Sequence, residues 1–209
     1  MAACYIDVRD LLGLHPSSPK LTAHISSLVT LIPASNTPLK PEVKCYPDIV
    51  YFNYHLVGLT MQFKPINGYK PTTGTRHDEL KQENLVLDCV DIYNVPKPQP
   101  GASTSKTKSS HASYPISPFT LSLVPIPGNS RPSSLSVSPG TNGKDFVSCF
   151  GEPDRKGGGA GPSSGSIGIW CEWTKDGVMV EFGGDESRGP QAWERGKDAT
   201  WKVISIFRS

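Results

Sequence analysis

The chain has 209 residues and a formal net charge of +2, with 20 glycines and 20 prolines. That length suits one large domain or two small ones, and so much glycine and proline predicts that part of the chain is loop. Residues 96–142 hold four basic side chains and no acidic one, which leaves a net charge of −2 for the remainder. No part therefore has the concentrated basic face of a duplex-binding domain, and we expect no nucleic-acid partner.

The first residues, MAACYIDVRD, lack the basic cluster and following apolar run that mark a secretory signal. No stretch of the chain reaches 18 consecutive apolar residues, so we expect no membrane-spanning helix and place the protein in the cytoplasm or nucleus. The five cysteines are dispersed and odd in number. This pattern favours buried thiols in a reducing compartment over disulfides or a zinc site.

Two helices are predicted at the start of a first α+β unit, which we assign to residues 1–95. Residues 7–16 predict a short helix that ends at Gly13, because glycine readily adopts the left-handed conformation that terminates helices. After it, Ser18 can cap a second helix with Pro19 at its first position, where the missing N–H has no helical partner. The unit therefore opens with helical structure.

Strands are predicted to complete this unit. Residues 51–63 carry apolar side chains at alternating positions on either side of Gly58, a pattern typical of a β-hairpin with a tight turn. Residues 85–93 alternate in a similar way and predict a third strand. Each strand then presents one apolar face to a common core.

Residues 96–139 contain nine prolines and twelve serines. The few apolar groups cannot offset the roughly 1–2 kcal/mol per residue lost on ordering a backbone, so we predict a disordered linker. Within it, residues 118–126 alternate apolar side chains and are expected to add an edge strand to the second unit, with a docking motif as the alternative. Ser117 and Ser138 each precede a proline, which makes them candidate phosphorylation sites for proline-directed kinases.

A second α+β unit, residues 140–209, follows the linker. Its helix is expected within residues 144–153 and ends at Gly151, which proline follows shortly after. Residues 170–182 predict a hairpin and residues 201–207 a final strand. The order helix, hairpin, strand thus occurs twice in the chain.

The two predicted hairpins align without a gap at an offset of 119 residues. An internal duplication is the preferred interpretation, although two short hairpins with a glycine turn can coincide by chance. The predicted fold class is therefore α+β, with two related helix-plus-antiparallel-β-meander units joined by a disordered Pro/Ser-rich linker. The matched positions are Tyr51 with Trp170, Tyr54 with Trp173, Gly58 with Gly177, Leu59 with Val178, Met61 with Val180 and Phe63 with Phe182.

The sequence contains no recognisable catalytic, metal or cofactor motif. The glycine cluster at residues 157–161 has neither dinucleotide nor phosphate-loop spacing, and the five histidines are dispersed, so we expect no cofactor and no metal. An enzymatic alternative is a nucleophilic site assembled from Cys89, His55 and Asp91, since such groups need not be neighbours in sequence.

Two tryptophans are candidates for contact with a partner. Trp193 lies in a polar loop, where a large aromatic side chain either anchors the loop to the core or faces another molecule. Trp170 and Trp173 differ in parity along one strand, so one side chain should face the core and the other the outer face. Trp170 is the second candidate contact.

The order of a helix ended by glycine, an aromatic strand, a glycine turn and a final strand that ends in V-x-I-Y or I-x-I-F resembles a known architecture. It is similar to the helix-plus-sheet modules of β-lactamase inhibitor proteins and of bacterial outer-membrane assembly lipoproteins, and it departs from them in its long linker. The resemblance implies binding to another protein and transfers no catalytic residue. We expect a non-catalytic protein-interaction or regulatory module. The alternative is a small enzyme or ligand-binding protein with a pocket between the two sheets.

Overall fold

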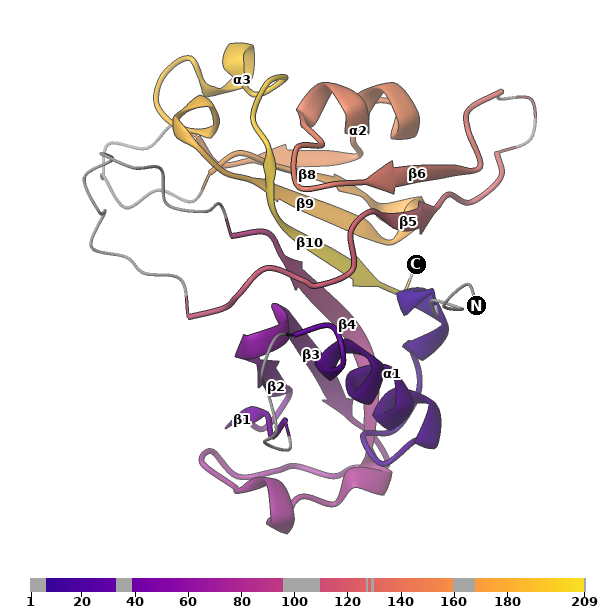
Figure 1. The fold of residues 1–209 in the computed structure, drawn as a ribbon. Helices are drawn as coiled ribbons and strands as arrows, with labels where there is room; N and C mark the ends of the chain where they lie inside the picture. Colours follow the sequence, from indigo (N-terminus) through magenta and orange to yellow (C-terminus); the bar gives the residue numbers. More distant parts are fainter. Residues whose placement is uncertain are drawn as a thin grey trace. The chain divides into compact units, whose positions relative to one another are not determined.

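The computed structural model describes residues 7–32, 39–95, 110–126, 128, 130–159 and 168–208. The chain divides into two compact units, one ending at Ile116 and the other running from Ser117 to Phe207. Both units combine helices with antiparallel strands, which confirms the α+β class (Figure 1). Within the ranges above, every helix is too short or too polar to cross a bilayer.

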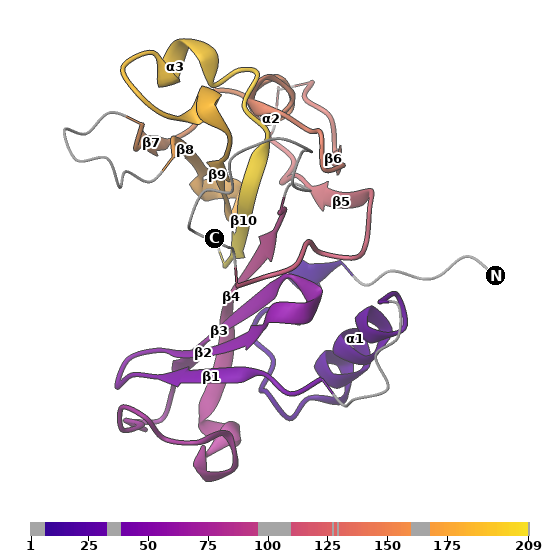
Figure 2. The same ribbon diagram turned by 60° about the vertical axis from the view of Figure 1, so that its left-hand side comes forward.

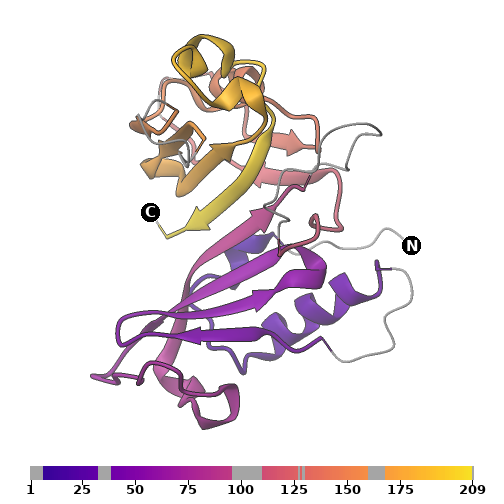
Figure 3. The same ribbon diagram turned by 90° about the vertical axis from the view of Figure 1, so that its left-hand side faces the viewer.

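The first unit is a helix packed on a four-stranded antiparallel meander. Apolar residues of the helix recur at helical spacing and are buried at Leu21, Ile25 and Leu28, and Figures 2 and 3 show the helix lying along one face of the sheet. The elements are η1 (Val8–Leu11), α1 (Pro19–Val29), β1 (Glu42–Cys45), β2 (Val50–Tyr54), η2 (His55–Val57), β3 (Leu59–Pro65), η3 (His77–Glu79), η4 (Gln82–Asn84) and β4 (Leu85–Tyr93), where η marks a 3-10 helix. The four strands pair in chain order.

The second unit has a similar meander with an aromatic core under its first helix. Ring centroids of Phe150 and Trp173 lie 5.0 Å apart, those of Phe146 and Phe182 lie 5.9 Å apart, and Trp173 Nε1 donates to Gly151 O at 2.9 Å. The elements are β5 (Phe119–Ser122), β6 (Ser134–Val137), α2 (Gly143–Phe150), β7 (Arg155–Gly157), β8 (Trp170–Trp173), η5 (Thr174–Asp176), β9 (Val178–Phe182), η6 (Asp185–Ser187), α3 (Ala192–Arg195) and β10 (Trp201–Phe207). Strands β7, β8, β9 and β10 pair in chain order.

The two predicted hairpins are present and have the same register. Tyr54 pairs with Leu59 in the first and Trp173 with Val178 in the second, and a 3-10 turn of three residues closes each loop. Gly58 and Gly177 follow these turns with φ of 55° and 59°, the left-handed region that glycine occupies without strain. The last strand of each meander, β4 or β10, ends in an aromatic residue whose N–H donates to this glycine's carbonyl. Tyr93 N donates to Gly58 O at 3.0 Å, and Phe207 N donates to Gly177 O at 2.9 Å.

The helix predicted for residues 7–16 is longer than the one in the structure. Only Val8–Leu11 form a 3-10 turn, because the next residues bond to β4 instead: Gly13 N donates to Leu87 O at 2.7 Å and Leu87 N to Leu14 O at 2.8 Å. The helix that precedes the meander in this unit is α1, in the position that α2 has in the second unit.

The sequence analysis did not predict the short edge strands β1 and β7. Each pairs with only one neighbour in its unit and has three or four residues, so neither shows a sustained alternation of apolar side chains. With them included, each unit has an α-helix and, after it, four antiparallel strands. The second unit differs in having β5 and β6 before α2 and the short helix α3 between β9 and β10.

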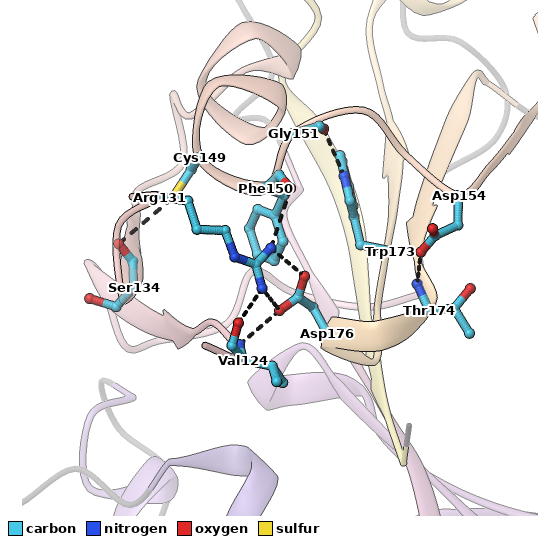
Figure 4. Close-up of polar contacts among 10 residues, drawn as sticks. All are labelled: Val124, Arg131, Ser134, Cys149, Phe150, Gly151, Asp154, Trp173, Thr174 and Asp176. Atoms are coloured by element: carbon cyan, nitrogen blue, oxygen red, sulfur yellow. Dashed lines mark hydrogen bonds and ion pairs between the residues drawn. The ribbon is translucent and has the colours of Figure 1, made fainter. Parts of the chain in front are cut away.

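The predicted disordered linker falls in two parts. Residues 96–109 lie outside the described residues. Residues 119–122 form the predicted strand, but its partner is residues 134–137 rather than the sheet of the second unit, so the prediction of disorder does not hold for these two strands. Leu121 and Val137 are buried, and the connection between the strands is held by Arg131, which pairs with Asp176 of η5 (Figure 4).

Candidate functional site

The two candidate tryptophans lie at different places in the second unit. Trp193 is in α3 and 43% exposed. Trp173 is buried, as expected for one of the two β8 tryptophans, while Trp170 is half-buried on the opposite face, where its ring lies against Gly157 of β7. The structure therefore does not bring Trp170 and Trp193 into one site.

A pocket lies beside Trp193, within the second unit. Its volume is about 290 Å³, and its lining comes from α2, β7, β8, β9 and the segment around α3. Ile169, Cys171 and Phe182 are buried and form an apolar interior. Val147 and Trp193 are exposed apolar residues of the same lining, with 36% and 43% of their surface accessible. The pocket thus offers apolar contact area both inside and around its opening.

Close backbone contact between α2 and the end of α3 builds one wall of this pocket. Gly143 N donates to Ala199 O at 3.0 Å and Lys144 N to Lys197 O at 2.9 Å. A Cβ on Gly143 would lie 2.3 Å from Gly196 O, closer than any side chain tolerates. Glycine at this first position of α2 is therefore required by packing.

Replacement of Gly143 with Ala is expected to lower the free energy of unfolding by about 1–3 kcal/mol, the usual range for overpacking. The direction of this change is informative. In an unhindered helix, alanine is about 1 kcal/mol more favourable than glycine, so a loss of stability points to the packing contact. Gly140→Ala is the matched control, since its Cβ would meet no atom within 4 Å. Urea denaturation of both variants checks the prediction, and equal midpoints would contradict it.

The rim of the pocket is basic. Lys144 on α2, Lys156 on β7 and Lys197 after α3 are exposed lining residues, and none of them forms an ion pair within the described part of the chain. Lys156 Nζ lies 5.7 Å from the centroid of the Trp193 ring, within cation–π range. Glu152 is the one acidic residue among the described residues that line the pocket.

The thiol in this pocket is poorly suited to act as a nucleophile. Burial raises the pKa of the Cys171 thiol to about 11, so the thiolate that would act as nucleophile is scarce at neutral pH. None of the described residues that line the pocket is a histidine, which could act as a base. Among the described residues, there is also no cluster of histidine, cysteine and carboxylate side chains able to hold a metal ion.

The alternative nucleophilic site in the first unit is not supported by its geometry. Burial, followed by the charge of Asp91, strongly raises the pKa of the Cys89 thiol, whose Sγ lies 3.8 Å from Asp91 Oδ1. His55 Nε2 instead contacts Glu42 Oε2 at 2.5 Å. The thiol therefore stays protonated, and the histidine has a carboxylate partner of its own.

A histidine missed by sequence reasoning lies on the outer face of the same sheet. The ring of His111 stacks on Tyr93 with centroids 3.9 Å apart and lies 4.3 Å from the ring of His55. Burial and then the nearby His55 lower the pKa of His111 to about 4, and the charge of Glu42 opposes this while that of Lys44 adds to it. The neutral ring is thus favoured in the folded protein.

Acidification from pH 7 to pH 5 is expected to destabilise the first unit by about 1–2 kcal/mol through His111. His111 binds its proton near pH 6.5 in the unfolded chain and only near pH 4 in the folded protein. The stability that the neutral ring contributes is therefore complete above pH 6.5 and is lost as the pH falls toward 4. Urea midpoints at the two pH values measure the loss. A His111→Gln variant should show a smaller difference between them, and an unchanged difference would contradict the assignment.

The two candidate phosphorylation sites are both exposed. Ser138 lies after β6, where its N–H donates to Thr141 Oγ1 at 2.9 Å and its carbonyl accepts from Trp201 Nε1 at 2.8 Å. Ser117 lies just before β5. Modification at Ser117 or Ser138 stays a prediction, and neither residue lines the pocket.

Comparison of the chain with protein-family models, with curated proteins and with solved structures gives no match. Its assignment therefore rests on the geometry and chemistry described above. The rim lysines were missed because they are dispersed in sequence, although one signal was available. In α2, Lys144 and Val147 are three residues apart and both exposed, so an apolar residue lies beside a lysine on the solvent-facing part of the helix.

Proposed function

We propose that this chain is a non-catalytic protein-interaction module, built on two copies of one α+β unit, and that the pocket beside Trp193 is its partner-binding surface. The duplication is supported by the shared element order and by the identical hairpin registers at an offset of 119 residues. The resemblance to inhibitor and assembly modules, which mostly bind proteins, points in the same direction.

The observation that carries the binding role is the exposure of Trp193 and Val147 at the edge of an apolar pocket. Tryptophan is enriched among the few residues that dominate binding energy, and such residues contact pockets from which water is excluded. A protein without a partner for this surface would lower its free energy by covering it. The Trp193 ring stays exposed despite its cation–π contact with Lys156.

A comparison of proteins captured by the full chain and by its Trp193→Ala variant tests the proposal. We expect a specific partner, identified by mass spectrometry, to be retained by the natural chain and lost from the variant. Leu56→Ala is the control, because Leu56 is 59% exposed and lies on η2 of the first unit, away from the pocket lining. Identical captures by the natural chain and Trp193→Ala, or no specific capture by either, would overturn the proposal.

Small-molecule binding is the second candidate function. The volume of about 290 Å³ lies at the lower end of the roughly 300–1,000 Å³ typical of ligand sites. Screening of small anionic aromatic compounds by thermal shift distinguishes the two functions. A compound that stabilises the natural chain by several degrees, but not Trp193→Ala, would favour this second function.

A further inference from the structure

We propose that the pocket beside Trp193 binds an acidic peptide segment of a partner protein, with one bulky apolar side chain of that segment entering the pocket. This inference rests on the proposed function and names the chemistry of the partner. Two features of the pocket carry it: the charge of its rim and the size of its interior.

The charge of the rim selects an acidic partner. Lys144 on α2, Lys156 on β7 and Lys197 after α3 line one opening, and Glu152 is the single acidic residue among the described residues of the lining. Like charges held together without counterions repel one another, so a bound carboxylate lowers the free energy of the site. The rim therefore favours aspartate or glutamate on both sides of a bound anchor.

Two basic side chains of the same sheet have carboxylate partners, unlike the rim lysines. Arg155 precedes Lys156 in β7 and points to the other face, where it pairs with Glu172 at 3.4 Å. Lys202 on β10 pairs with Glu181 at 2.7 Å. Among the described residues, the three rim lysines have no such carboxylate partner.

The interior selects a single apolar anchor. Ile169, Cys171 and Phe182 present carbon and sulfur atoms to the cavity, and a polar group inserted among them would lose its hydrogen bonds to water. A volume near 290 Å³ accepts one large side chain rather than a folded surface. Trp193 and Val147 can then cover the inserted side chain from the rim, which excludes water from the contact.

Fluorescence anisotropy with labelled decapeptides and the full chain tests this inference. One peptide has a central Phe flanked by Glu and Asp, a second has Gln and Asn in place of the acids, and a third has Ala in place of Phe. We expect the first to bind at least tenfold more tightly than the others, and the advantage over the neutral peptide to shrink with added salt.

Variants of the chain assign the charge effect to the rim. Lys156→Gln should weaken binding of the acidic peptide about two- to fivefold, the range for one exposed ion pair, and the triple change at Lys144, Lys156 and Lys197 more than tenfold. Lys175→Gln is the matched control, because Lys175 is an exposed lysine on η5 outside the pocket lining. Its affinity should equal that of the natural chain.

The outcomes separate this inference from the proposed function. Equal binding of the acidic and neutral peptides, or tighter binding to phosphatidylserine vesicles than to the acidic peptide, overturns the inference, while a partner that still depends on Trp193 keeps the function. Failure of all peptides also overturns the inference. Loss of both peptide binding and Trp193-dependent capture removes the inference and the function together.

Discussion

Replacement of Arg131 with Met is expected to lower the free energy of unfolding of the second unit by about 3–5 kcal/mol, the range for breaking a buried ion pair on one side. Figure 4 shows the arrangement: the guanidinium of Arg131 faces both carboxylate oxygens of Asp176, at 2.8 Å each. The two side chains are only 9% and 3% exposed. Loss of Arg131 leaves a buried carboxylate without its charge partner.

Further hydrogen bonds to Arg131 and Asp176 increase the loss of stability that we expect. Arg131 also donates to the carbonyls of Phe150 and Val124, while the N–H of Val124 donates to Asp176 at 2.8 Å. The ion pair therefore joins the β5–β6 ribbon to α2 and to the hairpin turn. We expect the ribbon to become accessible to protease in Arg131→Met under conditions where the natural chain resists cleavage.

The first hairpin supplies a control for this prediction. Val57 occupies the position equivalent to Asp176 at the offset of 119 and is fully buried, so an apolar side chain suits this turn. The double variant Arg131→Met with Asp176→Val removes both charges and should recover most of the lost stability. Chemical denaturation of the single and double variants measures this recovery. A double variant no more stable than Arg131→Met would show that the pair is not the source of the loss.

Replacement of Gly58 with Ala is expected to lower the free energy of unfolding of the first unit by more than about 2 kcal/mol. Two costs combine at this position. The φ of 55° disfavours any side chain, and the added Cβ would lie 2.4 Å from Ala112 O and 2.7 Å from Tyr114 N. Backbone atoms cannot rotate away as a flexible side chain can, so the segment at 112–114 must shift.

That segment is held in place by its own hydrogen bonds. Ala112 N donates to His55 O at 2.8 Å and Tyr114 N to Tyr93 O at 2.9 Å. Gly68→Ala is the matched control, because Gly68 has φ of 73° but no atom within 4 Å of its Cβ position. Urea midpoints should therefore fall much further for Gly58→Ala than for Gly68→Ala. Equal losses would mean that backbone conformation alone, rather than contact with residues 112–114, sets the cost.

The candidate site was predictable only in part. Trp193 was recognisable as an unusual aromatic residue in a polar segment, and its exposure agrees with contact to a partner. Lys156 lies 37 positions earlier and approaches Trp193 only because β7 pairs with β8 and α3 folds back over the sheet end. No local pattern marks such a pair, since its members share neither a strand nor a helix.

Local signals determined the hairpins, the strand segments 85–93 and 201–207, and the helix beginning at Pro19, because alternation, helical spacing and glycine turns depend on residues close in sequence. Tertiary structure alone decided the ribbon at 119–137 and the pocket. In the Pro/Ser-rich tract, the residues next to Arg131 do not predict ordered structure, because its ion-pair partner Asp176 is 45 residues away in sequence. That buried pair and the burial of Leu121 and Val137 offset the entropy of ordering the tract. The alternation in residues 118–126 predicted the first strand of the ribbon, but its pairing with residues 134–137 had no local signal.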